Sequence, residues 1–314
     1  MAVPLWIDCD TGVDDALGLL LALGRPDVQL VGVSVTAGNC PLEDAVANTL
    51  GVLTLGGGGR IPVHPGARRP LLEPLRPARA MHGDDGIGGL RSVLPPPIAS
   101  ASTLPAAPAL WAAALACDGE LTVVTTGPLS NLAAAAVAYP ELPPRIRHVV
   151  LMGGAVTVAG NVTATAEFNI ATDPEAASIV LRAGWPLTVV GLDVTMTVLV
   201  GPAVAEALSH RAEPGPRFCA QALRFYQEAY RRQIGRPQAP MHDPLAVAVA
   251  LDPTLVETVT CPVEVETEGR WSRGTLLTDR RLEPARPVGW PTARVALRVD
   301  AHRAVQGMMD AWAR

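Results

Sequence analysis

The sequence predicts an α/β protein in which a mostly parallel, Rossmann-like central sheet is flanked by helices. Short apolar runs typical of strands alternate with helical runs along most of the chain, the order expected of parallel strands joined by crossover helices. Hydrophobic residues make up 49% of the 314 positions, which is enough for one large core. Because the alternation continues through the proline-rich stretches, we expect a single domain over residues 1–314.

The first strand and the first helix enclose an acidic turn. Residues 3–7 are apolar and predict a short buried strand, and residues 16–23 begin an apolar helix. Four carboxylates lie between them and would repel one another without a cation, but the nearest arginine, Arg25, is a helix length away. An acidic helix start would explain one or two of them. A hard divalent ion, Ca²⁺ or Mg²⁺, explains all four, which are Asp8, Asp10, Asp14 and Asp15.

The later elements follow the same alternation. We expect further strands at residues 30–36, 121–126, 148–152, 187–193, 261–267, 274–278 and 293–299, with a short one inside 56–80. We expect helices around residues 43–48, up to residue 138, after residue 173, at 202–210, 216–233 and 243–251, and from residue 301. Loops are expected at residues 81–86, 91–108 and 160–174. The last strands predict a later antiparallel addition to the sheet.

Composition excludes several classes of function. The net charge of −5 and the lack of a basic block argue against a nucleic-acid partner. The chain has no lysine, which removes Schiff-base chemistry and a Walker-type phosphate site. Its five cysteines are scattered without a CxxC motif, so we expect a reducing compartment without disulfides or zinc. Without a signal-like N-terminus or a long uninterrupted apolar stretch, we expect a cytoplasmic protein with no membrane partner.

A set of polar residues lies just after the predicted strands and has no evident structural role there. Parallel strands bring their carboxyl ends to one edge of the sheet, so residues distant in sequence can meet at that edge. Amides and carboxylates suit the hydroxyl groups of a sugar, and together with a hard cation they describe a site for a polyol such as ribose. The set is Asp10, Asp14, Asp15, Asn39, Thr126, Asn161, Glu167, Asn169, His242 and Asp243.

Six motifs, in this order and nearly end to end, resemble the calcium-dependent nucleoside N-ribohydrolases of the inosine-uridine preferring nucleoside hydrolase family. They are DCDTGVDDALGLLLAL, TAGNCPLEDAVANTLGVL, MHGDDGIGG, TTGPLSNLA, LMGGAVTVAGNVTATAEFNIATDPEAA and MHDPLAVAVALDP. The resemblance implies the nucleoside hydrolase fold. It also implies hydrolysis of the N-glycosidic bond of inosine, uridine or cytidine to ribose and free base, and assembly into a homotetramer or homodimer.

The resemblance further implies a role for individual residues. Those that would hold Ca²⁺ are Asp10, Asp15, Asp243 and the backbone carbonyl of Thr126, and Asp10 would also be the general base towards a metal-bound water. Those that would clasp the ribose hydroxyls or line the substrate site are Asp14, Asn39, Met152, Asn161, Glu167, Phe168 and Asn169. His82 and His242 would flank the base, with His242 as the leaving-group acid, a pair typical of inosine-uridine and pyrimidine-preferring relatives.

Two positions depart from the family pattern, and three aromatic residues have an open role. Thr11 stands where the family usually has proline, which should alter the turn slightly, and Met196 stands where a polar residue is common. The aromatic residues could reach a base or gate the site, although core packing is the favoured interpretation of each; they are Tyr226, Tyr230 and Trp271.

Two other functions remain open at this stage. The run Asp8-Cys9-Asp10-Thr11 fits the DxDxT opening of haloacid-dehalogenase-like phosphatases, with Asp8 as the nucleophile, although the basic residue such enzymes need, usually lysine, is not evident. A non-catalytic, Ca²⁺-dependent nucleoside-binding protein would keep the metal and ribose residues but lose the base or the acid. Asp10 and His242 are both present, which argues for turnover.

Overall fold

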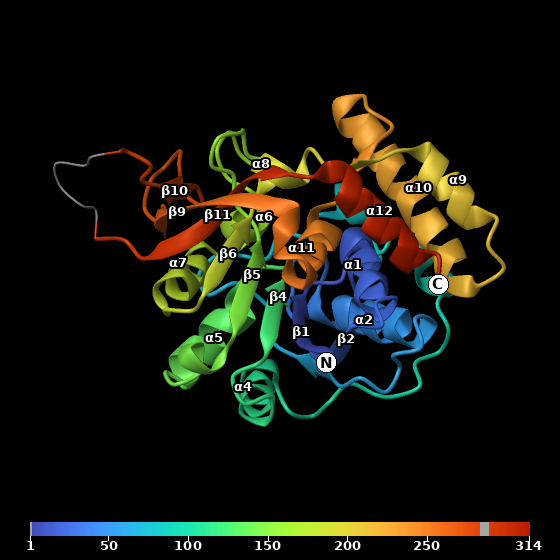
Figure 1. The fold of residues 1–314 in the computed structure, drawn as a ribbon, viewed down its shortest axis with the longest axis horizontal. Coiled ribbons are helices and arrows are strands. Elements are labelled where there is room, and N and C mark those ends of the chain that lie inside the picture. The colour runs from blue at the N-terminus through green and yellow to red at the C-terminus, as the bar shows by residue number, and fades with distance from the viewer. Residues whose placement is uncertain (1, 283–288) are drawn as a thin grey trace.

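A central sheet lies between two layers of helices (Figure 1). The computed structural model describes residues 2–282 and 289–314. Within these ranges nine strands form the sheet, in the order β10-β9-β11-β6-β5-β4-β1-β2-β3. The strands are β1 (Val3–Cys9), β2 (Val28–Val35), β3 (Val63–Pro65), β4 (Thr122–Thr125), β5 (His148–Met152), β6 (Leu187–Val190), β9 (Val256–Val265), β10 (Leu276–Thr278) and β11 (Thr292–Val299).

The sheet is mostly parallel, as predicted. Seven neighbouring strands pair in parallel, in the spatial order β11-β6-β5-β4-β1-β2-β3. β9 is antiparallel to both of its neighbours, β10 and β11. The chain leaves β1 towards β2 and β3, and then returns to place β4 on the other side of β1. At such a reversal the loops after the two strands diverge and leave a crevice at their carboxyl ends, where α/β proteins bind ligands.

The helices cover both faces of the sheet. The helices are α1 (Val13–Leu23), α2 (Leu42–Leu55), α3 (Arg79–His82), α4 (Ala106–Ala116), α5 (Ser130–Ala138), α6 (Phe168–Thr172), α7 (Pro174–Arg182), α8 (Leu192–Thr195), α9 (Pro202–Ser209), α10 (Pro214–Ile234), α11 (His242–Leu251) and α12 (Ala301–Trp312). In Figure 1, α4, α5 and α7 lie on one side of the sheet and α1, α2, α11 and α12 on the other. Side chains alternate between the two cores along β1, where Leu5 and Ile7 face α1 and Trp6 faces α4.

Smaller elements complete the chain. A two-stranded antiparallel ladder pairs β7 (Leu199–Val200) with β8 (Ala239–Pro240). Short 3-10 turns cover Leu90–Val93, Pro143–Arg145 and Pro253–Leu255. No helix in the described ranges is long and apolar enough to cross a membrane.

The strand expected at residues 187–193 is shorter than predicted. It ends at Val190, and Leu192–Thr195 form the single-turn helix α8. Gly191 permits this change of direction because a Cβ there would lie 2.7 Å from the Gly154 carbonyl oxygen. The carboxylate of Asp193 then accepts backbone N–H groups from a neighbouring loop, a contact that no local pattern reveals.

Three expected loops contain helical turns, and one strand begins early. His82 ends α3, the segment at 160–174 contains α6, and α4 begins at Ala106 inside the stretch expected to be a loop. Of these three helices, α6 depends on a capping group outside the hydrophobic pattern, because Glu167 accepts the N–H groups of its first turn. β9 starts five residues before the expected 261, because its first residues pair with β11 although most of their side chains are exposed.

Candidate active site

A cavity of about 450 Å³ opens at the carboxyl ends of the parallel strands. This volume suits a small molecule. The described residues that line it include most of those predicted from the sequence: Asp14, Asn39, His82, Thr126, Met152, Asn161, Glu167, Phe168, Asn169, His242 and Asp243. The other two, Asp10 and Asp15, are buried and do not line the cavity, but they interact electrostatically with the carboxylates of Asp14 and Asp243, which do.

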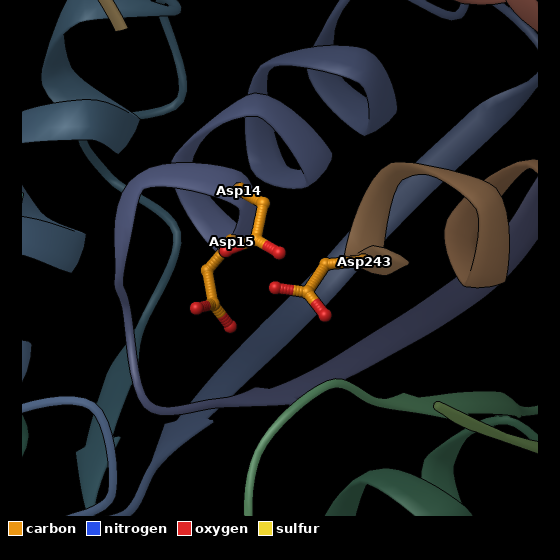
Figure 2. Close-up of side chains that lie close together, drawn as sticks. All are labelled: Asp14, Asp15 and Asp243. Carbon is orange, nitrogen blue, oxygen red and sulfur yellow. The ribbon is translucent and has the colours of Figure 1, made fainter. Parts of the chain in front are cut away.

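Three carboxylates converge at the floor. One oxygen each from Asp14, Asp15 and Asp243 lies within 4.8 Å of the others, and all three residues are buried. Figure 2 shows Asp14 and Asp15 at the start of α1 and Asp243 at the start of α11, with their carboxylates turned towards one another. The carboxylates that the family resemblance implies as metal ligands are Asp10, Asp15 and Asp243. The group of three observed here contains Asp14 instead of Asp10.

Asp10 follows β1 directly and is fully buried beside Asn39. Its carboxylate accepts the Asn39 backbone N–H at 2.6 Å and the side-chain amide at 3.1 Å, and the same amide also donates to Asp15 at 3.1 Å. Glycine at position 38 permits this approach, since a Cβ there would lie 2.0 Å from the Asp10 carboxylate. Asn39, predicted to bind ribose, therefore already holds two of the acidic residues together.

Burial and mutual repulsion disfavour ionisation of this acidic group. Burial, followed by the charge of Asp15, raises the pKa of Asp10 well above its usual range, and burial followed by Asp14 does the same to the pKa of Asp243. The pKa of Asp15 rises to about 6, again mainly through burial. Within this acidic group, Asp14 Oδ1 is a buried oxygen without a hydrogen-bond partner among the described residues. A divalent cation among these oxygens would reverse the repulsion, so the residues fit a hard metal ion.

Thr126 and Asn169 connect the acidic floor to the wall of the cavity. The Thr126 hydroxyl donates to Asp15 at 2.8 Å, and its backbone carbonyl, a predicted metal ligand, accepts the Asn169 amide at 2.7 Å. The same amide lies 3.1 Å from the Met152 carbonyl. A carbonyl oxygen has two lone pairs, so the bond to Asn169 leaves one for another partner.

Glu167 and Asn161 shape the opposite wall. The Glu167 carboxylate caps α6 and accepts backbone N–H groups from Asn169, Ile170 and Gly154 at 2.9–3.2 Å. Asn161 is exposed and accepts the Phe168 N–H at 2.9 Å. These bonds fix the orientation of both side chains while each keeps acceptor capacity towards the cavity.

His82 is buried against the acidic turn. Its Nδ1 accepts the Val13 N–H at 3.1 Å, so the proton of the neutral ring resides on Nε2. Burial lowers the pKa of His82 to about 4 despite the opposing charge of Asp15. The ring is therefore neutral near pH 7 and can donate one hydrogen bond.

His242 opens α11, and both of its ring nitrogens are occupied. Nδ1 lies 2.8 Å from the Thr195 hydroxyl, and Nε2 lies 2.8 Å from the Tyr230 hydroxyl. Burial lowers the pKa of His242, and the charge of Asp14 partly offsets this. Tyr230 is thus hydrogen-bonded to the predicted acid, and both residues line the cavity.

Two tyrosines of α10 belong to the site, a role that the sequence left open beside the favoured core packing. Tyr226 and Tyr230 pack in the core, as expected, but they also line the cavity. The Tyr226 hydroxyl donates to Asp14 at 2.9 Å. Their spacing of four residues on a helix is the available signal, and it is equally typical of core packing. The expected core role of Trp271 is wrong, because this side chain is 80% exposed and stacks with Arg270.

The two departures from the family pattern have definite positions. The Thr11 hydroxyl lies 2.7 Å from the Thr49 hydroxyl, so it ties the acidic turn to α2. Met196 follows α8 and lines the cavity as an apolar side chain. The first departure therefore affects the anchoring of the turn, and the second affects the polarity of the wall.

The phosphatase alternative requires Asp8 at the site. Asp8 lies within β1, is buried, and accepts hydrogen bonds from Ser34 and, at 2.8 Å, from Asn131. It is not among the described residues that line the cavity. A nucleophile in this position could not reach a substrate bound there.

Comparison with known proteins connects this site to one family. The family described as inosine-uridine preferring nucleoside hydrolase matches residues 5–306. A protein of Enterobacter sp. (strain 638) named pyrimidine-specific ribonucleoside hydrolase RihA is 38% identical over 280 residues, which are 89% of this chain and 88% of that protein. A protein of the same name from Shewanella sp. (strain ANA-3) is 36% identical over 314 residues, which are 100% of this chain and 97% of that protein.

Solved structures agree with the predicted fold class. A plant nucleoside hydrolase, PpNRh1, superposes with a TM-score of 0.93 at 30% identity, covering 99% of each chain. A purine-preferring ribonucleoside hydrolase from Gardnerella vaginalis superposes with a TM-score of 0.92 at 35% identity, covering 99% of this chain and 98% of the other. The resemblance and the α/β fold predicted from the sequence are both confirmed.

Proposed function

Because this chain belongs to the inosine-uridine preferring nucleoside hydrolase family and is therefore a ribonucleoside hydrolase, we propose a mechanism that uses Ca²⁺, Asp10 as general base and His242 as acid. The reaction releases ribose and a free base. The observation that carries this proposal is the group of buried carboxylates under a cavity whose wall holds two histidines.

The residues proposed to hold Ca²⁺ are Asp10, Asp15, Asp243 and the carbonyl of Thr126. All four donors are oxygens, which suits a hard cation. Asp243 and Thr126 line the cavity, whereas Asp10 and Asp15 are buried without lining it, so this set of oxygens reaches from the protein interior to the cavity. When bound, the cation supplies positive charge that orients a water molecule and lowers its pKa.

Asp10 accepts the proton of the attacking water in this mechanism. Its hydrogen bonds to Asn39 fix the carboxylate in one orientation, as a general base requires. Attack on the anomeric carbon from the side opposite the base inverts its configuration and passes through an oxocarbenium-like transition state.

The ribosyl group is proposed to lie between the acidic floor and the α6 wall. Asp14, Asn39, Asn161, Glu167 and Asn169 hold its hydroxyl groups. Their side chains are already oriented by bonds to backbone groups or to one another, so little entropy is lost when they bind. Met152 and Phe168 supply apolar contacts to the same ring.

His242 protonates the departing base, with His82 donating a hydrogen bond to it. The lowered pKa of His242 makes its protonated form a stronger acid towards the base. The Tyr230 hydroxyl on Nε2 is positioned to pass the proton onward. Relatives named pyrimidine-specific support a preference for uridine and cytidine over inosine.

The acid role is tested with His242→Ala on two substrates. Uridine turnover should fall by about 100- to 10,000-fold, the usual contribution of a general acid. p-Nitrophenyl riboside should be cleaved at nearly the wild-type rate, because its leaving group needs no proton. Equal losses on both substrates would show that His242 is not the acid.

Three broader properties belong to the same proposal. The chain forms one domain over residues 1–314, acts in the cytoplasm, and assembles into a homotetramer or homodimer. The dispersed cysteines support the cytoplasmic location. Light scattering of the purified protein distinguishes the assembly states.

A further inference from the structure

We infer that Tyr226 is a positioning residue for the ribosyl group, acting through Asp14. The Tyr226 hydroxyl holds one oxygen of the Asp14 carboxylate and so directs the other to a ribose hydroxyl. This inference rests on the proposed function, and it explains why an aromatic residue of α10 reaches the acidic floor.

The bond from Tyr226 to Asp14 is buried and well defined. Both residues are almost fully buried, and the hydroxyl lies 2.9 Å from Asp14 Oδ2. Burial, together with the charge of Asp14, raises the pKa of Tyr226 far above its ordinary value, so the phenol stays protonated. It can therefore serve as a donor to the carboxylate at any pH at which the protein works.

The second oxygen of Asp14 lacks a donor. Asp14 Oδ1 is buried and has no hydrogen-bond partner among the described residues. His82 Nδ1, at 3.9 Å, cannot fill this role because it already accepts the Val13 N–H. A buried acceptor left unpaired is costly, so the ligand in the cavity should bring a donor to it. A ribose hydroxyl is such a donor. Uracil N3–H and the cytosine amino group are donors too, and the comparison with p-nitrophenyl riboside below separates the sugar from the base.

The Tyr226 ring is held from two sides. It packs edge-on against Tyr230, with ring centroids 5.1 Å apart, and lies 5.8 Å from the His82 ring. These ring contacts fix the position of the hydroxyl, which also interacts with the hydroxyl of Tyr230. Tyr226→Phe therefore removes the bond to Asp14 and keeps the packing, which makes it a clean test of the hydroxyl alone.

The test measures Tyr226→Phe on uridine and on three related substrates. p-Nitrophenyl riboside lacks the pyrimidine base, and 2′-deoxyuridine and 3′-deoxyuridine each lack one ribose hydroxyl. On uridine, Tyr226→Phe should lower kcat/KM by roughly 10- to 100-fold, the usual value of a hydrogen bond to a charged group. The loss on p-nitrophenyl riboside should be equal, because both substrates carry the same ribosyl group. On either 2′-deoxyuridine or 3′-deoxyuridine the loss should shrink to within about twofold, because the hydroxyl that Asp14 would hold is already missing.

Two results would overturn the inference. A loss on uridine without a loss on p-nitrophenyl riboside would mean that Tyr226 acts on the base. Equal losses on uridine and on both deoxyuridines would mean that the hydroxyl has no link to a ribose hydroxyl. For a deoxyuridine that is not turned over, its inhibition constant against p-nitrophenyl riboside replaces kcat/KM in this comparison.

Tyr139→Phe is the matched control. Tyr139 stacks on Trp111 at 5.3 Å, at the end of α5 remote from the cavity, and should keep wild-type activity on all four substrates. Absence of ribose release by the wild-type protein would refute the proposed function. Wild-type activity that Tyr226→Phe leaves unchanged would refute this inference alone.

Discussion

Asp8 and Asp10 are two buried carboxylates of the same segment with different surroundings. Asp8 is bonded to Ser34 and Asn131 within the sheet, whereas Asp10 is bonded to Asn39 beneath the cavity. Their separation by one residue makes them a matched pair, in which the same substitution tests a catalytic and a structural position.

Asp10→Asn should abolish turnover while the fold stays intact. The amide cannot accept the proton of water, so kcat should fall by about 100- to 10,000-fold. Ribose release from uridine measures this loss, and thermal unfolding checks the fold. Asp8→Asn is the control and should retain activity within a few-fold. Near-normal turnover by the Asp10→Asn variant would show that Asp10 is not the general base.

Asp8→Asn should also change how the free energy of unfolding depends on pH. Burial raises the pKa of Asp8 from 3.8 to about 7, so between these values the folded chain keeps a proton that the unfolded chain releases. Its contribution to stability is therefore full below about pH 4 and is lost as the pH rises through 7. Relative to wild type, Asp8→Asn should gain stability from pH 4 to pH 8, by on the order of 4 kcal/mol at most.

Urea unfolding at a series of pH values measures this difference. The Asn side chain keeps an acceptor for Ser34 and Asn131 and carries no charge. A difference between variant and wild type that stays constant with pH would show that Asp8 ionises normally in the fold.

For individual residues, the sequence predicted which polar side chains belong to the site, but it did not predict which partners those side chains contact. Asp8, Asp10, Asp14 and Asp15 stand out in the sequence because four acids within eight residues need an explanation. The structure brings Asp243 to this group, whereas Asp8 is bonded to Ser34 and Asn131 within the sheet. The bond from Tyr226 to Asp14 could not be predicted, because a tyrosine on an amphipathic helix has the same sequence pattern whether its hydroxyl bonds Asp14 or faces solvent.

Among the elements, the turn after β1 and the short helix α3 form one unit. His82 of α3 packs directly on Gly12, where a Cβ would lie 2.4 Å from His82 Nδ1 and 2.7 Å from the Asn39 amide. Glycine is thus needed at this position for space, since its φ of −91° is open to any residue.

Gly12→Ala should displace both neighbours. We expect a loss of about 1–3 kcal/mol in stability from the steric overlap. Uridine kcat/KM should fall at least about tenfold, because His82 and Asn39 move together. Urea unfolding and ribose release measure the two effects.

Gly18→Ala is the control within the same segment. A Cβ there meets its nearest neighbour, Val247, at an ordinary 3.5 Å, and alanine favours the helix α1 by about 0.5–1 kcal/mol. This variant should be at least as stable as wild type and fully active. If Gly12→Ala behaved in the same way, the close approach of His82 would not be needed.

Long elements could be predicted and single turns could not. The strand at residues 148–152 and the helix after Asp173 match, because hydrophobic runs and an Asp-Pro start define them locally. The single-turn helices α6 and α8 depend on contacts across the fold, such as Glu167 with the Gly154 N–H and Asp193 with the Val156 N–H.

For the whole molecule, strand order creates the site. The chain reverses at β1, so the loops after β1 and β4 bring Asp10 and Thr126 to one edge, and α11 adds His242 and Asp243. The alternation of elements predicted a parallel sheet, but it does not specify which strands are neighbours. That order follows from how the helices pack on each face, which is a property of the complete chain.

Ribose release is the most direct measurement of the whole mechanism. Uridine, cytidine, inosine, adenosine and guanosine are each mixed with the native protein, with chelated protein, and with chelated protein to which Ca²⁺ is restored. We expect release with native protein, fastest from uridine or cytidine, loss after chelation and recovery with Ca²⁺. Absence of release from every nucleoside, or release that chelation leaves unchanged, would contradict a Ca²⁺-dependent nucleoside hydrolase.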